Sequence, residues 1–226
     1  MAKVIFKCFL KEVKDKFPIQ KISSKDFKWF DRMNKFYQDN PRKVQTNKCP
    51  GILSTLQTGW IQKTYQPITI TTNGDKKTFS WHTPYNQKKG ENGFLIDNYV
   101  SSHEYDQLAK FKNLGDSVLD TVIKIQSPWR VIIPKDYYLL STAIPYNDDV
   151  NFTAATGLLM GENFLNVQLF WHKLKGDYTI PSGTPLCYYL LIKKEKFHSE
   201  ISMLNNEEID IIKQDQINFF NKKLKS

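Results

Sequence analysis

The chain has 226 residues, of which 40% are hydrophobic and 14% aromatic, and its formal net charge is +9. This length suits one large domain, and so much apolar material excludes general disorder. The lysines are scattered along the chain, which favours a solvated basic surface over a dedicated patch for nucleic acid or lipid headgroups. The charge leaves a nucleic-acid partner open, without a motif to support it.

Three cysteines stand far apart, at Cys8, Cys49 and Cys187. This sparse, odd set contains no disulfide framework and no pair spaced like metal ligands, so we expect a reducing compartment. Lysines interrupt the apolar residues at the N-terminus, which argues against a signal peptide. No apolar run approaches the roughly twenty residues that a membrane-spanning helix needs. The sequence therefore predicts a soluble intracellular product, or one released by lysis, without membrane contact.

The N-terminal part predicts a mixture of strand and helix. Residues 4–10 indicate a short strand, and the lysines in and around it are typical of a sheet edge. Residues 26–37 follow a pair of serines and carry one apolar stripe, so we expect a serine-capped helix. Cys49 and Pro50 then predict a loop that enters one helical turn.

The clearest short-range signal is a hairpin centred on Asn73 and Gly74. Strand-forming residues at 68–72 and 78–82 flank this pair, and Asn-Gly supplies the positive φ angles that such turns need. The segments that follow are expected as a loop (83–98), a helical turn or loop (101–108) and a strand (118–125).

Residues 129–195 carry the densest strand signals. Two Ile-Pro phrases, at 133–134 and 180–181, each lead into a run of aromatic and β-branched residues, at 137–144 and 186–192. Such residues fit a pleated, half-buried surface, so both runs are predicted strands.

Between these two runs, residues 165–171 alternate apolar and polar side chains, the pattern of a strand with one buried face. The segment from Gly157 to Gly161 indicates a turn that joins strands. Repeated short strands with Pro and Gly at their joints predict a mainly β chain with an antiparallel core of jelly-roll, cupin-like or β-clip type. We expect one domain, with an N-terminal α/β elaboration (1–58), a β core (59–200) and a C-terminal helix (201–226).

The C-terminal helix is predicted from its caps and charges. Asn205 and Asn206 can cap its start, acidic residues follow, and lysines lie near its end. Its apolar residues step along one side at helical spacing: Ile209, Ile212, Ile217, Phe220 and Leu224. This amphipathic helix can pack on its own sheet or on a neighbouring subunit.

Four histidines are the main candidates for chemistry. The iron site of a β-barrel oxygenase needs two histidines and a carboxylate, for which His82, His103 and His172 are the candidate histidines. The usual trace of such a site is a histidine followed two residues later by a carboxylate, and it is missing at His103, so no metal site is predicted. His198 completes the set. The predicted cofactor set is therefore none, and catalytic residues stay unknown.

Other catalytic patterns are also missing. The chain contains no Gly-x-Ser-x-Gly elbow and no phosphate-binding glycine loop. Cys49 at a helix start can host a reactive thiolate, although a small buried residue is the simpler interpretation. Two tyrosine pairs, at 137–138 and 188–189, should each place one ring in the core and one on the opposite face. An exposed outer ring suits protein or sugar contacts, whereas a ring covered by the terminal helices is structural.

The segment 157–186 resembles the strand rhythm of the dUTPase and dCTP-deaminase group, through its Gly-apolar-apolar turn, the strand from Leu165, and the Ile180 to Gly183 entry into a final strand. Met160 stands where that group has its water-activating acid, and its Arg-Ser-Gly motif has no counterpart near Ser141. The resemblance therefore implies strand order and not nucleotide hydrolysis.

Over nearly its whole length the chain also resembles an uncharacterised family carried by marine T4-like phages and some bacteria. The matching features are Cys49-Pro50, Gly59-Trp60-Ile61, the Asn-Gly-Asp hairpin with Trp81, residues 103–107, Pro128-Trp129, Pro134 with Tyr137, and the phrase that begins at Ile180. The family implies no reaction and no catalytic residues.

Together these observations predict a non-enzymatic phage protein that acts by contact with other phage proteins or with itself, in the virion or the host cytoplasm. The alternatives are a small β-barrel enzyme, either a non-haem iron oxygenase that uses His103, His172 and an acidic residue, or a β-clip relative that acts on nucleotides.

Overall fold

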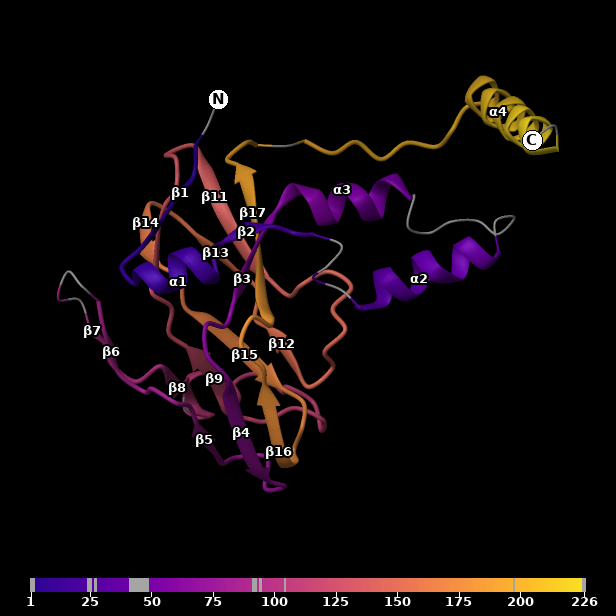
Figure 1. Ribbon diagram of the computed structural model, residues 1–226. Helices are drawn as coiled ribbons and strands as arrows, with labels where there is room; N and C mark the ends of the chain where they lie inside the picture. The colour runs from indigo at the N-terminus through magenta and orange to yellow at the C-terminus, as the bar shows by residue number, and fades with distance from the viewer. Residues whose placement is uncertain are drawn as a thin grey trace. The chain divides into compact units, whose positions relative to one another are not determined.

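The computed structural model describes residues 3–23, 26, 28–40, 49–90, 93, 95–103, 105–196 and 198–224. The chain divides into two compact units, Met1–Lys194 and Glu195–Ser226, and each is described by itself. Strands make up 36% of the structure and helices 20%, with several antiparallel sheets. The predicted mainly β class, with helical elements toward both ends of the chain, is confirmed (Figure 1).

The helices are α1 (Lys11–Lys16), α2 (Lys28–Asp39), α3 (Pro50–Thr58), a 3-10 helix (Tyr105–Gln107) and α4 (Asn206–Leu224). The strands are β1 (Ile5–Cys8), β2 (Gln20–Lys21), β3 (Trp60–Lys63), β4 (Ile68–Asn73), β5 (Phe79–His82), β6 (Lys88–Lys89), β7 (Leu95–Ile96), β8 (Val100–His103), β9 (Val122–Ile125), β10 (Trp129–Ile132), β11 (Tyr137–Thr142), β12 (Phe152–Ala154), β13 (Gly157–Leu159), β14 (Glu162–Phe164), β15 (Val167–Trp171), β16 (Lys175–Ile180) and β17 (Pro185–Lys193).

These strands form antiparallel sheets around one main core. The strand orders are β13-β11-β17-β3-β2, β12-β15-β9-β8, β1-β10-β14, β16-β4-β5 and β6-β7. The main core takes residues from the four larger sheets, including Ile70, Ile123, Val131 and Leu139, all of which are completely buried. The arrangement is sandwich-like: the apolar faces of the sheets are turned toward each other.

The two strand runs after the Ile-Pro phrases pair with each other, as β11 and β17. Their register joins six residue pairs, from Tyr137 opposite Lys193 to Thr142 opposite Tyr188. Each Ile-Pro phrase ends in a turn: the Tyr137 amide donates to the Pro134 carbonyl, and the Thr184 amide donates to the Pro181 carbonyl. Both predicted strands are confirmed.

The predicted hairpin is also confirmed, as β4 and β5, but its turn is longer than a two-residue Asn-Gly turn. Gly74 and Lys76 have positive φ angles, of 95° and 62°. The Asp75 carboxylate accepts hydrogen bonds from the Lys77 and Thr78 amides. The hydrogen bond from the Thr78 hydroxyl, together with these two amide bonds, holds the pKa of Asp75 well below its usual range. The side chain of Asp75 thus closes the loop that two residues alone do not span.

Several short elements were not predicted or were predicted wrongly. The segment 101–108, expected as a helical turn or loop, begins with strand β8, and its second part contains the expected helical turn as the 3-10 helix Tyr105–Gln107. The 157–161 turn contains strand β13. The strand expected at 118–125 begins at Val122, and helix α1 was missed. Strands of three or four residues gain their stability from pairing with distant segments, which local patterns do not reveal.

The remaining N-terminal predictions hold in part. Strand β1 lies at the edge of its sheet, paired with β10 alone, as its lysines indicated. Helix α2 occupies the predicted place, while Ser24, one of the two expected capping serines, lies outside the described residues. Helix α3 begins at Pro50, as the Cys49-Pro50 pair predicted, but it continues for nine residues instead of the single turn expected.

Helix α4 begins with a reciprocal cap. The Glu208 amide donates to the Asn205 side chain, and the Asn205 amide donates to the Glu208 carboxylate, at 2.9 and 2.8 Å. This pattern satisfies two amides that a helix start leaves unpaired. The structure does not describe the side chains of residues 216–224, so the predicted apolar stripe can be compared with the structure only at Ile209 and Ile212. Among the described residues, no helix is long and apolar enough to cross a membrane.

Candidate functional site: an open apolar face and its edge strand

The five-stranded sheet has two apolar faces. Its register places Leu139, Leu159 and Leu191 side by side on the face that packs into the main core. Side chains alternate along a strand, so their neighbours Leu140, Leu158 and Leu190 lie together on the opposite, outer face. Other parts of the protein shield only some of these outer side chains from solvent.

One half of the outer face is covered by the N-terminal helices. Tyr188 and Ile61 are completely buried there, in a second cluster with Leu56 of α3. Trp29 and Phe30 of α2 pack against the same cluster. Figure 1 shows α3 alongside β17 and β3.

Gly59 and Tyr188 fix α3 to the sheet. The Tyr188 hydroxyl accepts a hydrogen bond from the Gly59 amide, at 2.8 Å, and donates to the Thr55 carbonyl. A Cβ atom at Gly59 would lie 2.2 Å from the Tyr188 ring and 2.4 Å from the Tyr189 carbonyl oxygen. Position 59 is therefore restricted to glycine by close approach, at the point where α3 turns into β3.

Leu190 packs against this second cluster. The rest of the outer face is uncovered, and we call it the open face: Tyr138, Leu140, Leu158 and Ile192. Leu158 is 57% exposed and Ile192 38% exposed, while the other two are partly buried. Met160, just after β13, is also 57% exposed. Apolar side chains that gather on a surface in this way mark contact sites more often than scattered ones do.

The open face resolves the prediction made for the tyrosine pairs. Tyr189 lies in the main core, and Tyr188 lies under α3, so both are structural. Tyr138 lies on the open face, where the Lys194 ammonium sits 4.8 Å from the centre of its ring. Of these rings, Tyr138 is the one placed for a contact with another molecule.

A hollow runs beside β13, the edge strand of the same sheet. Its volume is about 320 Å³. Backbone and side chains of residues 155–159 line it, together with Ser141, Phe164, Asn166 and Gln168. β13 pairs with β11 on its other side, in an antiparallel register that centres on Leu158 opposite Leu140. This hollow was not predicted, because the sequence analysis places a turn at residues 157–161.

The three candidate metal ligands lie on two different sheets. His82 ends β5 and is exposed, whereas His103 ends β8 and its ring nitrogen lies 3.1 Å from the Gln107 side chain. His172 follows β15, and its ring nitrogen lies 2.7 Å from the Thr153 hydroxyl. Within the described ranges, no three His, Cys, Asp or Glu side chains are placed to hold a metal ion. The iron-oxygenase alternative thus gains no geometric support.

The cysteines differ in exposure. Cys49 is exposed at the start of α3. Cys187 is buried on the core face of β17, 3.0 Å from the Ser141 hydroxyl, and burial raises the pKa of its thiol to about 11. The buried position predicted as the simpler interpretation for Cys49 is therefore wrong, because the helix start at Pro50 projects into solvent.

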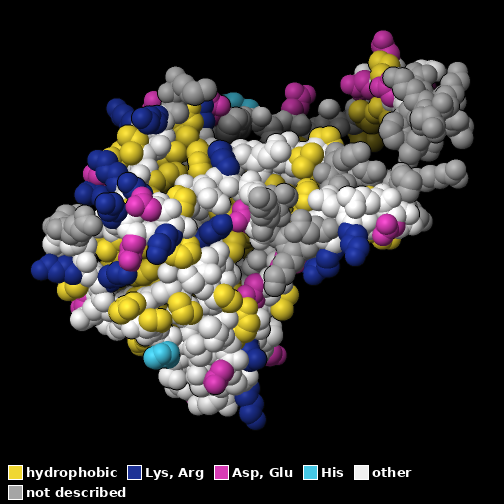
Figure 2. All heavy atoms as spheres, in the orientation of Figure 1, with side chains coloured by type: hydrophobic (Ala, Val, Ile, Leu, Met, Phe, Trp, Pro, Cys, Tyr) yellow, Lys and Arg dark blue, Asp and Glu magenta, His cyan; other side chains and the backbone are white. Residues whose placement is uncertain are grey.

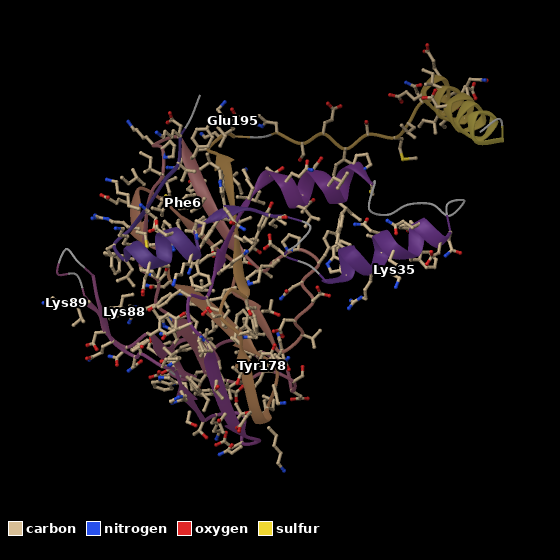
Figure 3. The ribbon with its side chains drawn as sticks, in the orientation of Figure 1. Phe6, Lys35, Lys88, Lys89, Tyr178 and Glu195 are labelled. Carbon is tan, nitrogen blue, oxygen red and sulfur yellow. The ribbon has the colours of Figure 1, made fainter. Side chains whose placement is uncertain are left out.

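A second hollow also has a volume of about 320 Å³. It was not predicted, because the Asn-Asp-Asp sequence at residues 147–149 is typical of a turn. It is lined by Asp26, Asn147, Asp148, Asp149 and Tyr178, with prolines on one side. The carboxylates are already engaged: Lys63 pairs with Asp26 at 2.6 Å, and the Tyr178 hydroxyl donates to Asp149. Burial and this bond raise the pKa of Tyr178, labelled in Figure 3, to about 12. Because Asp26 and Asp149 are paired within the protein, we interpret this hollow as structural and not as a binding site.

The basic surface is mixed. Figure 2 shows lysine and arginine side chains gathered over one side of the molecule, with acidic and hydrophobic side chains between them. Lys88, for example, pairs with Glu12, and Arg130 pairs with Glu162 at 3.0 Å.

No protein-family model matches the chain, and a search of curated proteins finds no match.

Proposed function

We propose that this chain is a non-enzymatic phage protein that acts by protein–protein contact, as a structural or assembly component of the virion. The open face carries the proposal. The open face is a group of apolar residues on the outer face of the five-stranded sheet. The protein itself covers the inner face of this sheet and the rest of its outer face. The resemblance to the T4-like phage family supports the phage setting, and the virion and the host cytoplasm are the proposed locations.

The free energy gained by burying the exposed apolar side chains favours association with a partner. Complete burial of one Leu or Ile side chain is worth roughly 1.5–3 kcal/mol. Leu158, Met160 and Ile192 leave between 38% and 57% of their area exposed. A partner that covers them gains a few kcal/mol from these residues alone, which is sufficient for the apolar centre of a contact surrounded by polar residues.

The test is quantitative mass spectrometry of phage particles purified on a gradient from the host that carries this gene. We expect a fixed number of copies per particle. The variant Ile192→Lys should lower this number about tenfold or more, since it places a charge in the contact. Phe111→Lys is the matched control, because Phe111 is 78% exposed on a loop away from the open face.

Two results would contradict the proposal. The first is a chain abundant in infected-cell lysate but missing from particles. The second is equal incorporation of the Ile192→Lys and wild-type chains, which would show that incorporation into the particle does not depend on the open face.

A further inference from the structure

Strand β13 is an edge strand without the protection that such strands usually carry. Edge strands commonly bear lysines, prolines or inward-pointing charges that prevent pairing with other chains. The edge strands β1 and β2 follow this rule, with Lys7 and Lys21. Residues 155–160, in contrast, are Ala-Thr-Gly-Leu-Leu-Met. β13 is therefore chemically suited to accept a further strand.

The hollow beside β13 indicates what that strand must be. None of its nine lining residues is ionisable, in a chain in which 24% of the residues are charged. Asn166 and Gln168 also line the hollow, and side-chain amides can hydrogen-bond to a peptide backbone. A charged side chain would find no partner there, so an uncharged, extended segment fits best.

Residues 201–205 of this chain have these properties. The sequence Ile-Ser-Met-Leu-Asn is uncharged and contains no proline, and it has no regular secondary structure. Ile201 is 98% exposed and Met203 93% exposed. Their spacing of two residues puts both side chains on one face of an extended strand.

We propose that residues 201–205 of a second copy of this chain bind beside β13 and add a sixth strand to the sheet. Ile201 and Met203 then continue the apolar rows of the open face next to Leu158, while the backbone pairs with the free edge of β13. This is recognition by strand addition, in which main-chain hydrogen bonds supply affinity and alternate side chains supply specificity. It rests on the proposed function, since it names the chain itself as the contact partner.

The experiment measures the mass of the purified full-length chain by light scattering after size exclusion. We expect the wild type to be a dimer or larger. Leu158→Lys, on the strand, and Met203→Lys, on the donated segment, should each weaken association about tenfold or more and give monomers. Both residues are largely exposed, so both variants should fold. Ile211→Lys, a change at an exposed site on α4, is the control and should associate like the wild type.

Mixing the two monomeric variants gives the deciding result. The Leu158→Lys chain still has a normal segment 201–205, and the Met203→Lys chain still has a normal β13, so an equimolar mixture should form heterodimers. Damage to folding would not be repaired by mixing.

A monomeric wild type overturns the inference, as does an oligomer that survives in both variants or a mixture that stays monomeric. Any of these results, combined with a fixed copy number in particles, leaves the proposed contact role intact with a different partner.

Discussion

Replacement of Gly59 by alanine tests how the sheet holds its covering helix. The added Cβ would meet the Tyr188 ring at 2.2–2.3 Å and the Tyr189 carbonyl oxygen at 2.4 Å. Both distances are far below van der Waals contact, and one partner is backbone, which cannot rotate away. The backbone of Gly59 has φ −96°, which alanine tolerates, so the cost comes from the contact and not from the conformation.

The magnitude follows from two terms. Overpacking of a well-filled core costs typically about 1–3 kcal/mol. Movement of the Tyr188 ring also breaks the hydrogen bond from the Gly59 amide, and an unsatisfied buried amide costs roughly 1–3 kcal/mol. We therefore expect Gly59→Ala to lose about 3–5 kcal/mol, a large part of the 5–15 kcal/mol that folded proteins commonly have.

Urea unfolding followed by tryptophan fluorescence measures this loss. The midpoint of Gly59→Ala should fall by about 1 M urea or more, given the usual slopes for urea unfolding. Gly51→Ala is the matched control, since no atom lies within 4 Å of the Cβ that it adds to the same helix. Its stability should stay unchanged or rise by up to about 1 kcal/mol.

An unfolding midpoint for Gly59→Ala within error of the wild type would refute the reasoning, because it would mean that α3 does not sit on Tyr188 as described. A loss of similar size in Gly51→Ala would point instead to a general sensitivity of α3 to side-chain addition.

Two further predictions concern titration and thiol chemistry. Burial raises the pKa of Tyr178 above the ordinary value of about 10, so the unfolded chain releases this proton first and stability should fall as the pH rises from about 10 to 12. Urea unfolding of Tyr178→Phe should show a shallower fall. At pH 8 a thiol reagent such as DTNB should label Cys49 quickly and Cys187 only after unfolding, since Cys187 is buried. Cys49→Ser should remove the fast phase, and fast labelling that persists would contradict this assignment.

The strands that the sequence predicted well are those whose signal is local. The β4–β5 hairpin follows from strand formers around Asn73 and Gly74, and β11 and β17 follow from their Ile-Pro entries. The strand β13 could not be predicted in the same way. Its three residues begin with Gly157, and Gly161 follows soon after them. They are extended because Leu159 and Leu158 pair with Leu139 and Leu140 of another strand.

The histidine hypothesis shows a second limit. The sequence places His103 in a predicted helical turn or loop and His172 at the end of a predicted strand, and it does not show whether the two meet. Their positions depend on strand order, and β9 separates β8, which ends at His103, from β15, which precedes His172. A pattern in one strand carries no information about which strand lies next to it, so no metal site could be derived or dismissed from the spacing alone.

The open face follows from a property of β11 that the sequence does contain. Tyr137, Tyr138, Leu139 and Leu140 are four apolar residues in succession, and a run without alternation is typical of a strand covered on both faces. In the structure, the cluster that contains α3 covers the outer face beside Tyr188 and Leu190. Leu158 and Ile192 on the same face of the first unit stay exposed, and these are the side chains that the proposed contact would cover.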